Sequence, residues 1–89
     1  MLVLPVDLTR AQATACLRML VQALRAEPGT TVVVDAGALT QFDSAALAVL
    51  LEVRRQTRVL GKSLVIRALP RRLCDLAALY GIAQLLPSS

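Results

Sequence analysis

The segment Thr31–Leu51 reads TVVVDAGALTQFDSAALAVLL, and the rest of the chain is arranged around it. Its first residues, Thr31–Val34, are a β-branched run of the kind found in strands that are buried on both faces. Asp35 closes this run, and Gly37 gives the following loop conformational freedom. Helix-forming residues then continue without a break from Ala45. The segment therefore predicts a buried strand, a loop and a helix.

The pair Asp43-Ser44 lies where this helix must begin. Either side chain can accept a hydrogen bond from an N–H group of the first helical turn. The helix dipole and the free N–H groups also favour an anion at this place. If Asp43 alone caps the helix, the Ser44 hydroxyl stays free at an exposed helix start; the alternative is that Ser44 is itself only a cap.

The composition indicates one small folded domain. The chain has 89 residues, of which 56% are hydrophobic and 18% charged, so it can supply a core and is not expected to be disordered. A net charge of +4 would suit nucleic acid or an acidic membrane surface. However, only Phe42 and Tyr80 could stack on bases, so we expect no nucleic-acid partner.

The location expected from the sequence is the cytoplasm. The longest apolar segment, Ala45–Leu51, is far too short to span a bilayer, so we expect no direct membrane insertion. The N-terminus lacks the basic region of a signal peptide. Cys16 and Cys74 fall within helical apolar patterns, which favours buried free thiols in a reducing compartment.

Strands and helices are expected to alternate along the chain. The expected strands are Leu2–Val6, Thr31–Val34 and Ser63–Ala68; the expected helices run from a capping box at Thr9–Gln12 to about Ala26, from about Ser44 to Leu60, and from about Arg71 to Tyr80, with a short packed segment at Ile82–Leu86. Apolar residues at helical spacing should form the buried helix faces: Leu17, Leu20, Val21 and Leu24; then Leu47, Leu50 and Leu51; then Leu73, Leu76 and Ala77.

This alternation predicts an α/β fold, a single small domain over residues 1–89. Its central sheet should be mostly parallel, with helices packed on it and right-handed crossovers. Ligands and partners of such folds meet the loops at the C-terminal ends of the strands. The segment 35–44 lies there.

Catalytic and cofactor chemistry finds little support in the residue types present. Histidine is absent, so Ser-His and Cys-His pairs cannot form, and no cofactor or metal site is expected. Asp35 and Asp43 bracket one loop and could form a carboxylate pair, although turn and cap formation is favoured. The cations Arg54, Arg55 and Arg58 suit the negative end of a helix dipole and need no ligand. An interaction module is better supported than an enzyme.

The residue pattern resembles the STAS domain family over nearly the whole chain. The resemblance rests on the strand that ends in Asp35, the loop that ends in Phe42-Asp43-Ser44 and the Ala-Leu-rich helix that follows. Gly61–Ile66 is similar to the next strand of the family, and Leu76–Ile82 (LAALYGI) to its last helix and turn. The family includes anti-sigma factor antagonists and the cytoplasmic tails of sulphate transporters.

Within this family, the short length, the segment Leu79–Ile82 and the Leu86-Pro87 tail are most similar to MlaB-type subunits. Those are cytoplasmic STAS partners of the ATPase in an ABC transporter that moves phospholipid and maintains outer-membrane lipid asymmetry. The similarity implies a non-catalytic subunit that binds and stabilises or regulates the ATPase, held at the inner membrane through that partner. The alternative is an anti-sigma factor antagonist that a partner kinase regulates by phosphorylating Ser44.

The resemblance also implies which residues bind the partner. Asp43 matches the acid of the family motif and Ser44 its Ser/Thr, which is phosphorylated in antagonist members and lies at the ATPase contact in the transporter subunit. The expected partner-binding residues are Asp43, Ser44, Ala45 and Leu47, with Asp35 and Gly37 supporting the loop.

Two departures from the family pattern affect these expectations. Ala46 stands where the motif usually has glycine, which would limit the close approach of a partner backbone. Family members usually begin with two strands, and this chain has room for about one before its first helix, so its sheet edge should be more exposed.

Overall fold

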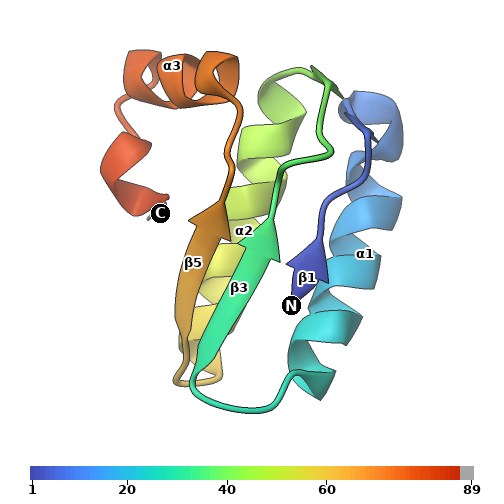
Figure 1. Ribbon diagram of the computed structural model, residues 1–89, viewed down its shortest axis with the longest axis vertical. Helices are drawn as coiled ribbons and strands as arrows, with labels where there is room; N and C mark the ends of the chain where they lie inside the picture. The colour runs from blue at the N-terminus through green and yellow to red at the C-terminus, as the bar shows by residue number, and fades with distance from the viewer. Residues whose placement is uncertain (87–89) are drawn as a thin grey trace.

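The computed structural model describes residues 1–86 of the chain (Figure 1). Its elements, in order, are β1 (Leu2–Val3), β2 (Asp7–Leu8), α1 (Arg10–Ala26), β3 (Thr31–Asp35), β4 (Gln41–Phe42), α2 (Ser44–Val59), β5 (Ser63–Arg67), α3 (Arg71–Leu79) and a short 3-10 helix, η1 (Ala83–Leu85). The helix bounds agree with the sequence predictions to within one or two residues. Residues 87–89, which the expected domain of residues 1–89 includes, lie outside the described part.

The main sheet has the strand order β1-β3-β5, and all its pairs are parallel. Val32 is aligned with Leu64, and Val34 with Ile66. Helix α1 connects β1 to β3 through the intervening β2, and α2 connects β3 to β5. This confirms the prediction of an α/β fold with a parallel sheet, which follows from the alternation of strands and helices.

Helices α1 and α2 both lie behind the sheet in Figure 1, and α3 lies beyond the C-terminal end of β5. Burial along the strands alternates accordingly: Val32 and Val34 have no exposed surface, whereas Val33 between them is partly exposed. The β-branched run at 31–34 predicted a strand buried on both faces, and that prediction is wrong. Strands of this composition also suit a sheet that is covered on one face only.

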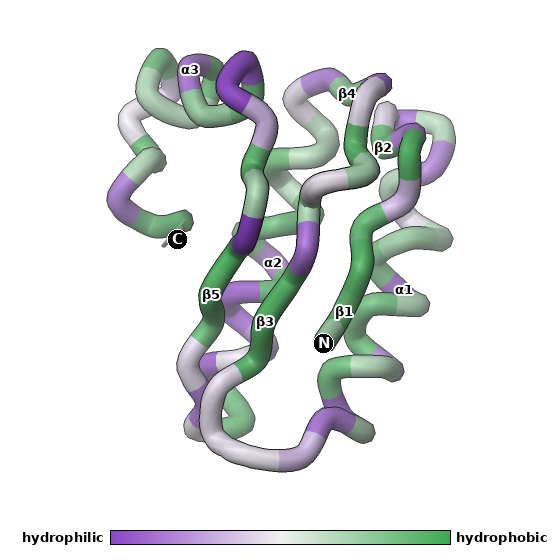
Figure 2. The backbone as a smooth tube through the Cα atoms, viewed as in Figure 1, coloured by the Kyte–Doolittle hydropathy of each residue, from purple (hydrophilic) through white to green (hydrophobic). Residues whose placement is uncertain are grey.

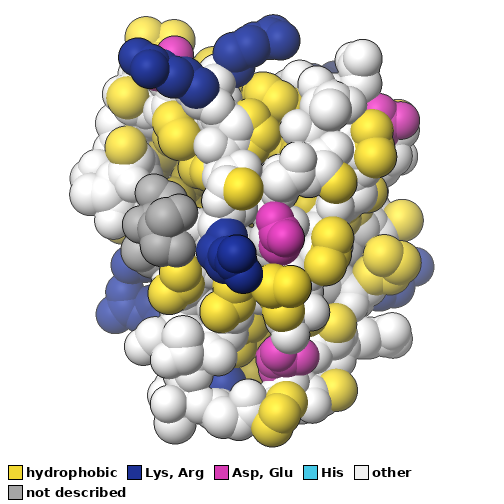
Figure 3. All heavy atoms as spheres, viewed as in Figure 1, with side chains coloured by type: hydrophobic (Ala, Val, Ile, Leu, Met, Phe, Trp, Pro, Cys, Tyr) yellow, Lys and Arg dark blue, Asp and Glu magenta, His cyan; other side chains and the backbone are white. Residues whose placement is uncertain are grey.

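The open face of the sheet is turned toward the viewer in Figure 3, where hydrophobic side chains lie beside single basic and acidic groups. In β5, Leu64 and Ile66 point into the core and Val65 toward this face. Figure 2 shows that both β3 and β5 carry a continuous hydrophobic stretch.

The N-terminal strand differs from its prediction because it is broken at Pro5. Only Leu2–Val3 joins the main sheet, and Asp7–Leu8 forms β2, which pairs with β4 in a separate two-stranded parallel sheet (Figure 2). Proline has no N–H to donate, so it interrupts strand pairing. The carbonyl of Val6 instead accepts hydrogen bonds from Thr40 N–H (2.9 Å) and Gln41 N–H (3.0 Å). One edge of the main sheet is therefore formed by the two residues of β1. The expectation of about one strand before the first helix is wrong, because two short strands, β1 and β2, precede α1.

The core is built mainly from aliphatic residues of the sheet and of the three α-helices. On α1 the buried residues are Cys16, Leu20 and Leu24, so the buried face is turned slightly from the predicted one, and Leu17 and Val21 are only partly buried. On α2 and α3, Leu47, Leu50, Leu73 and Ala77 are buried as predicted, while Leu51 and Leu76 are partly exposed. Burial raises the pKa of the Cys16 thiol. Cys74 is less buried than expected.

Within residues 1–86, no helix combines the length and the apolar character needed to cross a bilayer.

Candidate functional site

The starts of α1 and α2 lie together at the C-terminal ends of the strands, at the top of Figure 1. The pairing of β2 with β4 produces this arrangement, because α1 begins directly after β2 and α2 directly after β4. Leu8 is fully buried beneath it. Sequence analysis did not identify this small sheet, since two-residue strands carry no periodic signal.

A single carboxylate satisfies N–H groups at both helix starts. Asp43 Oδ1 accepts a hydrogen bond from Ala45 N–H (2.8 Å), which caps α2. Asp43 Oδ2 accepts one from Arg10 N–H (3.1 Å), the first residue of α1. Because both helix dipoles direct their positive ends here, the negative charge of Asp43 is stabilised by two helices at once. Asp43 therefore has a structural role, because it fixes the starts of α1 and α2 relative to each other.

The Ser44 side chain is exposed beside this cap. Within residues 1–86 the Ser44 hydroxyl makes no hydrogen bond, because Asp43 has taken the N–H groups that Ser44 could have capped. Of the two readings of Ser44, the geometry favours the one in which the hydroxyl remains free. It is available to a partner or to a modifying enzyme.

Among the other residues expected at the partner contact, Ala45 is half-buried and Leu47 is only 2% exposed. Leu47 belongs to the core, so its side chain cannot meet a partner, and the expectation of a direct contact is corrected. Helical spacing explains this: Leu47 lies with Leu50 on the face that packs against the sheet. Ala46, the departure from the family motif, is also fully buried, so its methyl group does not obstruct a partner.

A shallow apolar groove runs beside Ser44 between α1 and α2. It has a volume of about 160 Å³ and is lined by Ala13, Thr14, Leu17, Ala45, Ala48 and Val49. Ala48 and Thr14 are exposed, and sequence analysis missed both. The signal for Ala48 was present, because it follows Ser44 by four residues and so lies on the same helix face. Thr14 could not be predicted from the sequence, because its place in the groove depends on how α1 packs against α2.

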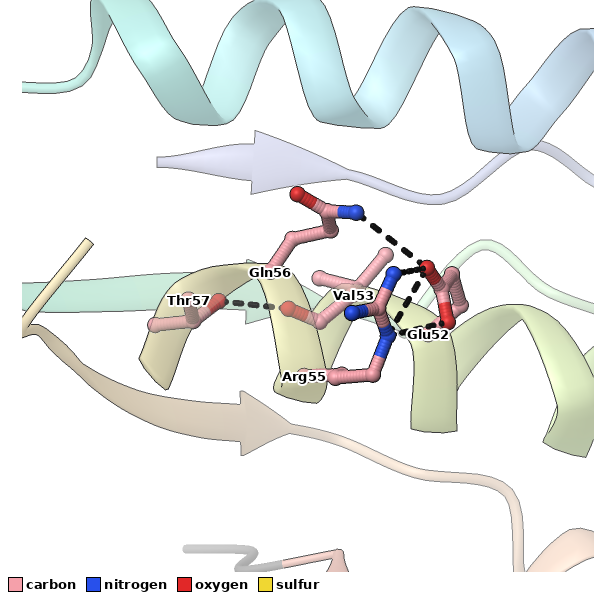
Figure 4. Close-up of polar contacts among 5 residues, drawn as sticks. All are labelled: Glu52, Val53, Arg55, Gln56 and Thr57. Atoms are coloured by element: carbon pink, nitrogen blue, oxygen red, sulfur yellow. Dashed lines mark hydrogen bonds and ion pairs between the residues drawn. The ribbon is translucent and has the colours of Figure 1, made fainter. Parts of the chain in front are cut away.

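The same face of α2 continues to Glu52 and Arg55, which form an ion pair. Arg55 Nε lies 2.9 Å from Glu52 Oε2, and Gln56 Nε2 donates to Glu52 Oε1 at 3.2 Å (Figure 4). The hydrogen bond from Arg55, followed by that from Gln56, lowers the pKa of Glu52 from 4.5 to about 2. Both side chains are at the surface, so the pair contributes little to stability.

The loop residues Asp35 and Gly37 form a local turn at the end of β3. Asp35 Oδ1 accepts a hydrogen bond from Gly37 N–H at 2.8 Å. A Cβ at position 37 would lie 3.0 Å from that oxygen, so a larger residue would force the carboxylate to shift. Gly37 does not have a positive φ, and the predicted reason for its presence, conformational freedom, is therefore corrected. Asp35 and Asp43 both bind backbone N–H groups, as turn and cap formation requires.

Helix α3 also reaches this end of the molecule. The guanidinium of Arg72 lies over the Phe42 ring, 5.6 Å from its centroid, in a cation–π contact. Since Phe42 belongs to β4 and directly precedes Asp43, this contact connects the start of α3 to the start of α2.

The fold and this site define a small α/β domain with helices on one sheet face and a free hydroxyl at a helix start. Residues 1–87 match the family model described as "Mlab, STAS domain", and the chain belongs to the STAS domain family. This confirms the resemblance found in the sequence. Among curated proteins, none matches this chain in sequence.

Proposed function

We propose that this protein is a non-catalytic interaction subunit that binds the cytoplasmic ATPase of an ABC-type phospholipid transporter. In this role it stabilises or regulates the ATPase and is held at the inner membrane by it. The observation that carries the proposal is the division of labour between Asp43 and Ser44. The carboxylate is used in folding and the neighbouring hydroxyl is left exposed. The choice of partner rests on the resemblance of the chain to MlaB-type subunits, whose name the matching family model also carries.

The surface around Ser44 is suited to close contact with another protein. Its groove is lined mostly by small residues, among them Ala45 and Ala48, so a partner's backbone or a short side chain can approach α2 closely. Few long side chains must be immobilised there, so little conformational entropy is lost on binding. The hydroxyl provides one directional hydrogen bond at the edge of this apolar groove.

A second candidate function is that of an anti-sigma factor antagonist regulated by phosphorylation of Ser44. The convergence of two helix N-termini favours it, because their N–H groups and dipoles stabilise a phosphate dianion. The charge of Asp43, which lies next to Ser44, opposes it. Asp43 already accepts hydrogen bonds from both helix starts, so fewer N–H groups are left there to stabilise a phosphate.

Co-purification from the native host distinguishes the two functions. A tagged chain is isolated under mild conditions, its partners are identified by mass spectrometry, and Ser44 is examined for phosphate. Recovery of an ABC ATPase with unmodified Ser44 supports the proposal. Recovery of a kinase and phosphate on Ser44 would instead establish the second function, and recovery of neither protein would contradict both.

A further inference from the structure

A basic pocket lies at the opposite end of α2 from Ser44. It is formed between the last turns of α2 and the start of β5, has a volume of about 260 Å³, and is lined by Arg54, Arg58, Lys62, Ser63 and Leu64. Three of these five residues carry a positive charge and none carries a negative one. This pocket is independent of the surface proposed to bind the ATPase.

The cations of the pocket form no ion pair within the described part of the chain. Arg54 and Arg58 are four residues apart, so they lie on one helix face, where like charges destabilise the helix. Glu52 is the nearest acid in sequence, and it is paired with Arg55 (Figure 4). Within residues 1–86, no carboxylate forms an ion pair with the three cations of the pocket. A bound anion would offset their repulsion.

Local structure holds Lys62 in this position. Gly61 has a φ of +71°, which ends α2 and reverses the chain into β5. Lys62 Nζ then donates to the carbonyl oxygen of Glu27, and Ser63 N–H donates to Thr30 O at 2.9 Å. An ammonium group has three donors, so Lys62 keeps two for a ligand. The Ser63 hydroxyl can add another.

The helix dipole accounts for only part of this cluster. Of the basic residues, only Arg58 lies in the last turn of α2, where the dipole effect is significant. Arg54 is in the preceding turn, and Lys62 follows the helix. The dipole therefore does not explain why these two residues line the same pocket as Arg58.

We propose that this pocket binds a phosphate group, carried either by a small soluble phosphomonoester or by a lipid headgroup. Guanidinium groups bind phosphate oxygens through paired hydrogen bonds, and lysine adds a point charge. The pocket is slightly smaller than those that take drug-sized ligands, so it fits a phosphate with a short organic body. Leu64 provides the apolar contact for that body.

Binding is measured by titrating the protein with inorganic phosphate and with glycerol 3-phosphate, following amide NMR shifts at constant ionic strength. We expect saturable shifts at residues 62–64, and at least a tenfold weaker affinity in an Arg54→Gln/Arg58→Gln variant. Lys62→Gln tests the same pocket with a single substitution. The matched control is Arg18→Gln/Arg25→Gln, which removes the same charge from α1, Arg25 being in its last turn.

The control should bind phosphate as the wild type does. Equal weakening in both double variants would show a general charge effect and overturn the proposal. The proposal would also be overturned if neither phosphate probe gave saturable shifts and the protein did not bind vesicles.

Vesicle sedimentation identifies the source of the phosphate. Binding to vesicles that contain phosphatidylglycerol, lost in the Arg54→Gln/Arg58→Gln variant and kept in the control, would assign the pocket to a lipid headgroup. Binding of glycerol 3-phosphate without vesicle binding would assign it to a soluble phosphomonoester. Vesicle binding that survives the pocket variant would place the lipid contact elsewhere and contradict the assignment to a headgroup.

Discussion

The two ends of helix α2 differ in almost every property that governs binding. At its start, Asp43 joins two helix N-termini, and the neighbouring surface is lined mostly by small, apolar residues beside the free Ser44 hydroxyl. At its end, Arg54 and Arg58 face a pocket with Lys62, and no acid of residues 1–86 forms an ion pair with them. The start is thus fixed by internal hydrogen bonds, whereas the end retains unpaired charge.

This difference separates two kinds of recognition. A surface of small residues favours close contact with a protein, where affinity depends on shape and on the exclusion of water. A cluster of cations favours an anionic group, with a strong dependence on salt. The proposal for the start of α2 draws on the resemblance to the family. The proposal for its end rests on the placement of charges in this chain.

The largest expected effect comes from Leu47, which lies under the start of α2 and is only 2% exposed. We expect Leu47→Ala to lower the free energy of unfolding by about 2–5 kcal/mol, because it leaves a cavity in the core. Chemical denaturation measures the loss, and Leu47→Met, which nearly keeps the volume, serves as the control. A stable Leu47→Ala protein that fails to bind its partner would return Leu47 to the contact surface.

A smaller effect is expected for Asp43. Asp43→Ala removes the hydrogen bonds to Ala45 N–H and Arg10 N–H, so we expect a loss of about 1–2 kcal/mol, typical of a helix cap. Asp43→Asn keeps one acceptor oxygen and should fall between Ala and the wild type. The measurement is again denaturation, with Ser44→Ala as the matched neighbour. If Ser44→Ala costs as much as Asp43→Ala, the division of labour between the two residues does not hold.

The smallest effect is expected from Glu52, midway along the helix. Its pKa is lowered from 4.5 to about 2 in the folded protein, so its interaction with Arg55 stabilises the fold above pH 4.5. That contribution decreases as the pH falls from 4.5 toward 2, where the folded carboxylate also becomes protonated. Melting temperatures of wild type and Glu52→Gln, recorded over this range, should therefore converge at low pH. A difference in melting temperature that grows on acidification would contradict a stabilising ion pair. Added salt should reduce the difference seen above pH 4.5.

The sequence was sufficient to predict the three α-helices and the strands β3 and β5, because each has a strong local signal. The β-branched run at 31–34, the capping box at Thr9–Gln12 and Gly61 define a strand, a helix start and a helix end without reference to the rest of the chain. Thr9 N–H indeed donates to Gln12 Oε1 at 2.9 Å. Gly61 has the positive φ typical of a helix terminus.

What the sequence could not provide depends on contacts between distant segments. The pairing of Asp7–Leu8 with Gln41–Phe42 has no local pattern, yet it places Arg10 N–H within reach of Asp43. Similarly, Arg54, Arg55 and Arg58 form one cluster in the sequence. In the fold, Arg55 pairs with Glu52, while the other two line a pocket with Lys62.

The central claim, that Ser44 marks the partner-binding surface, is tested most directly by Ser44→Arg. The affinity for the ABC ATPase and the melting temperature are measured together, with Gln22→Arg as a control that adds the same side chain to an exposed position of α1. We predict that Ser44→Arg keeps the wild-type melting temperature and weakens binding at least about tenfold, or about 1.4 kcal/mol, while Gln22→Arg binds normally. Normal binding by Ser44→Arg would contradict the claim and place the ATPase contact elsewhere on the domain.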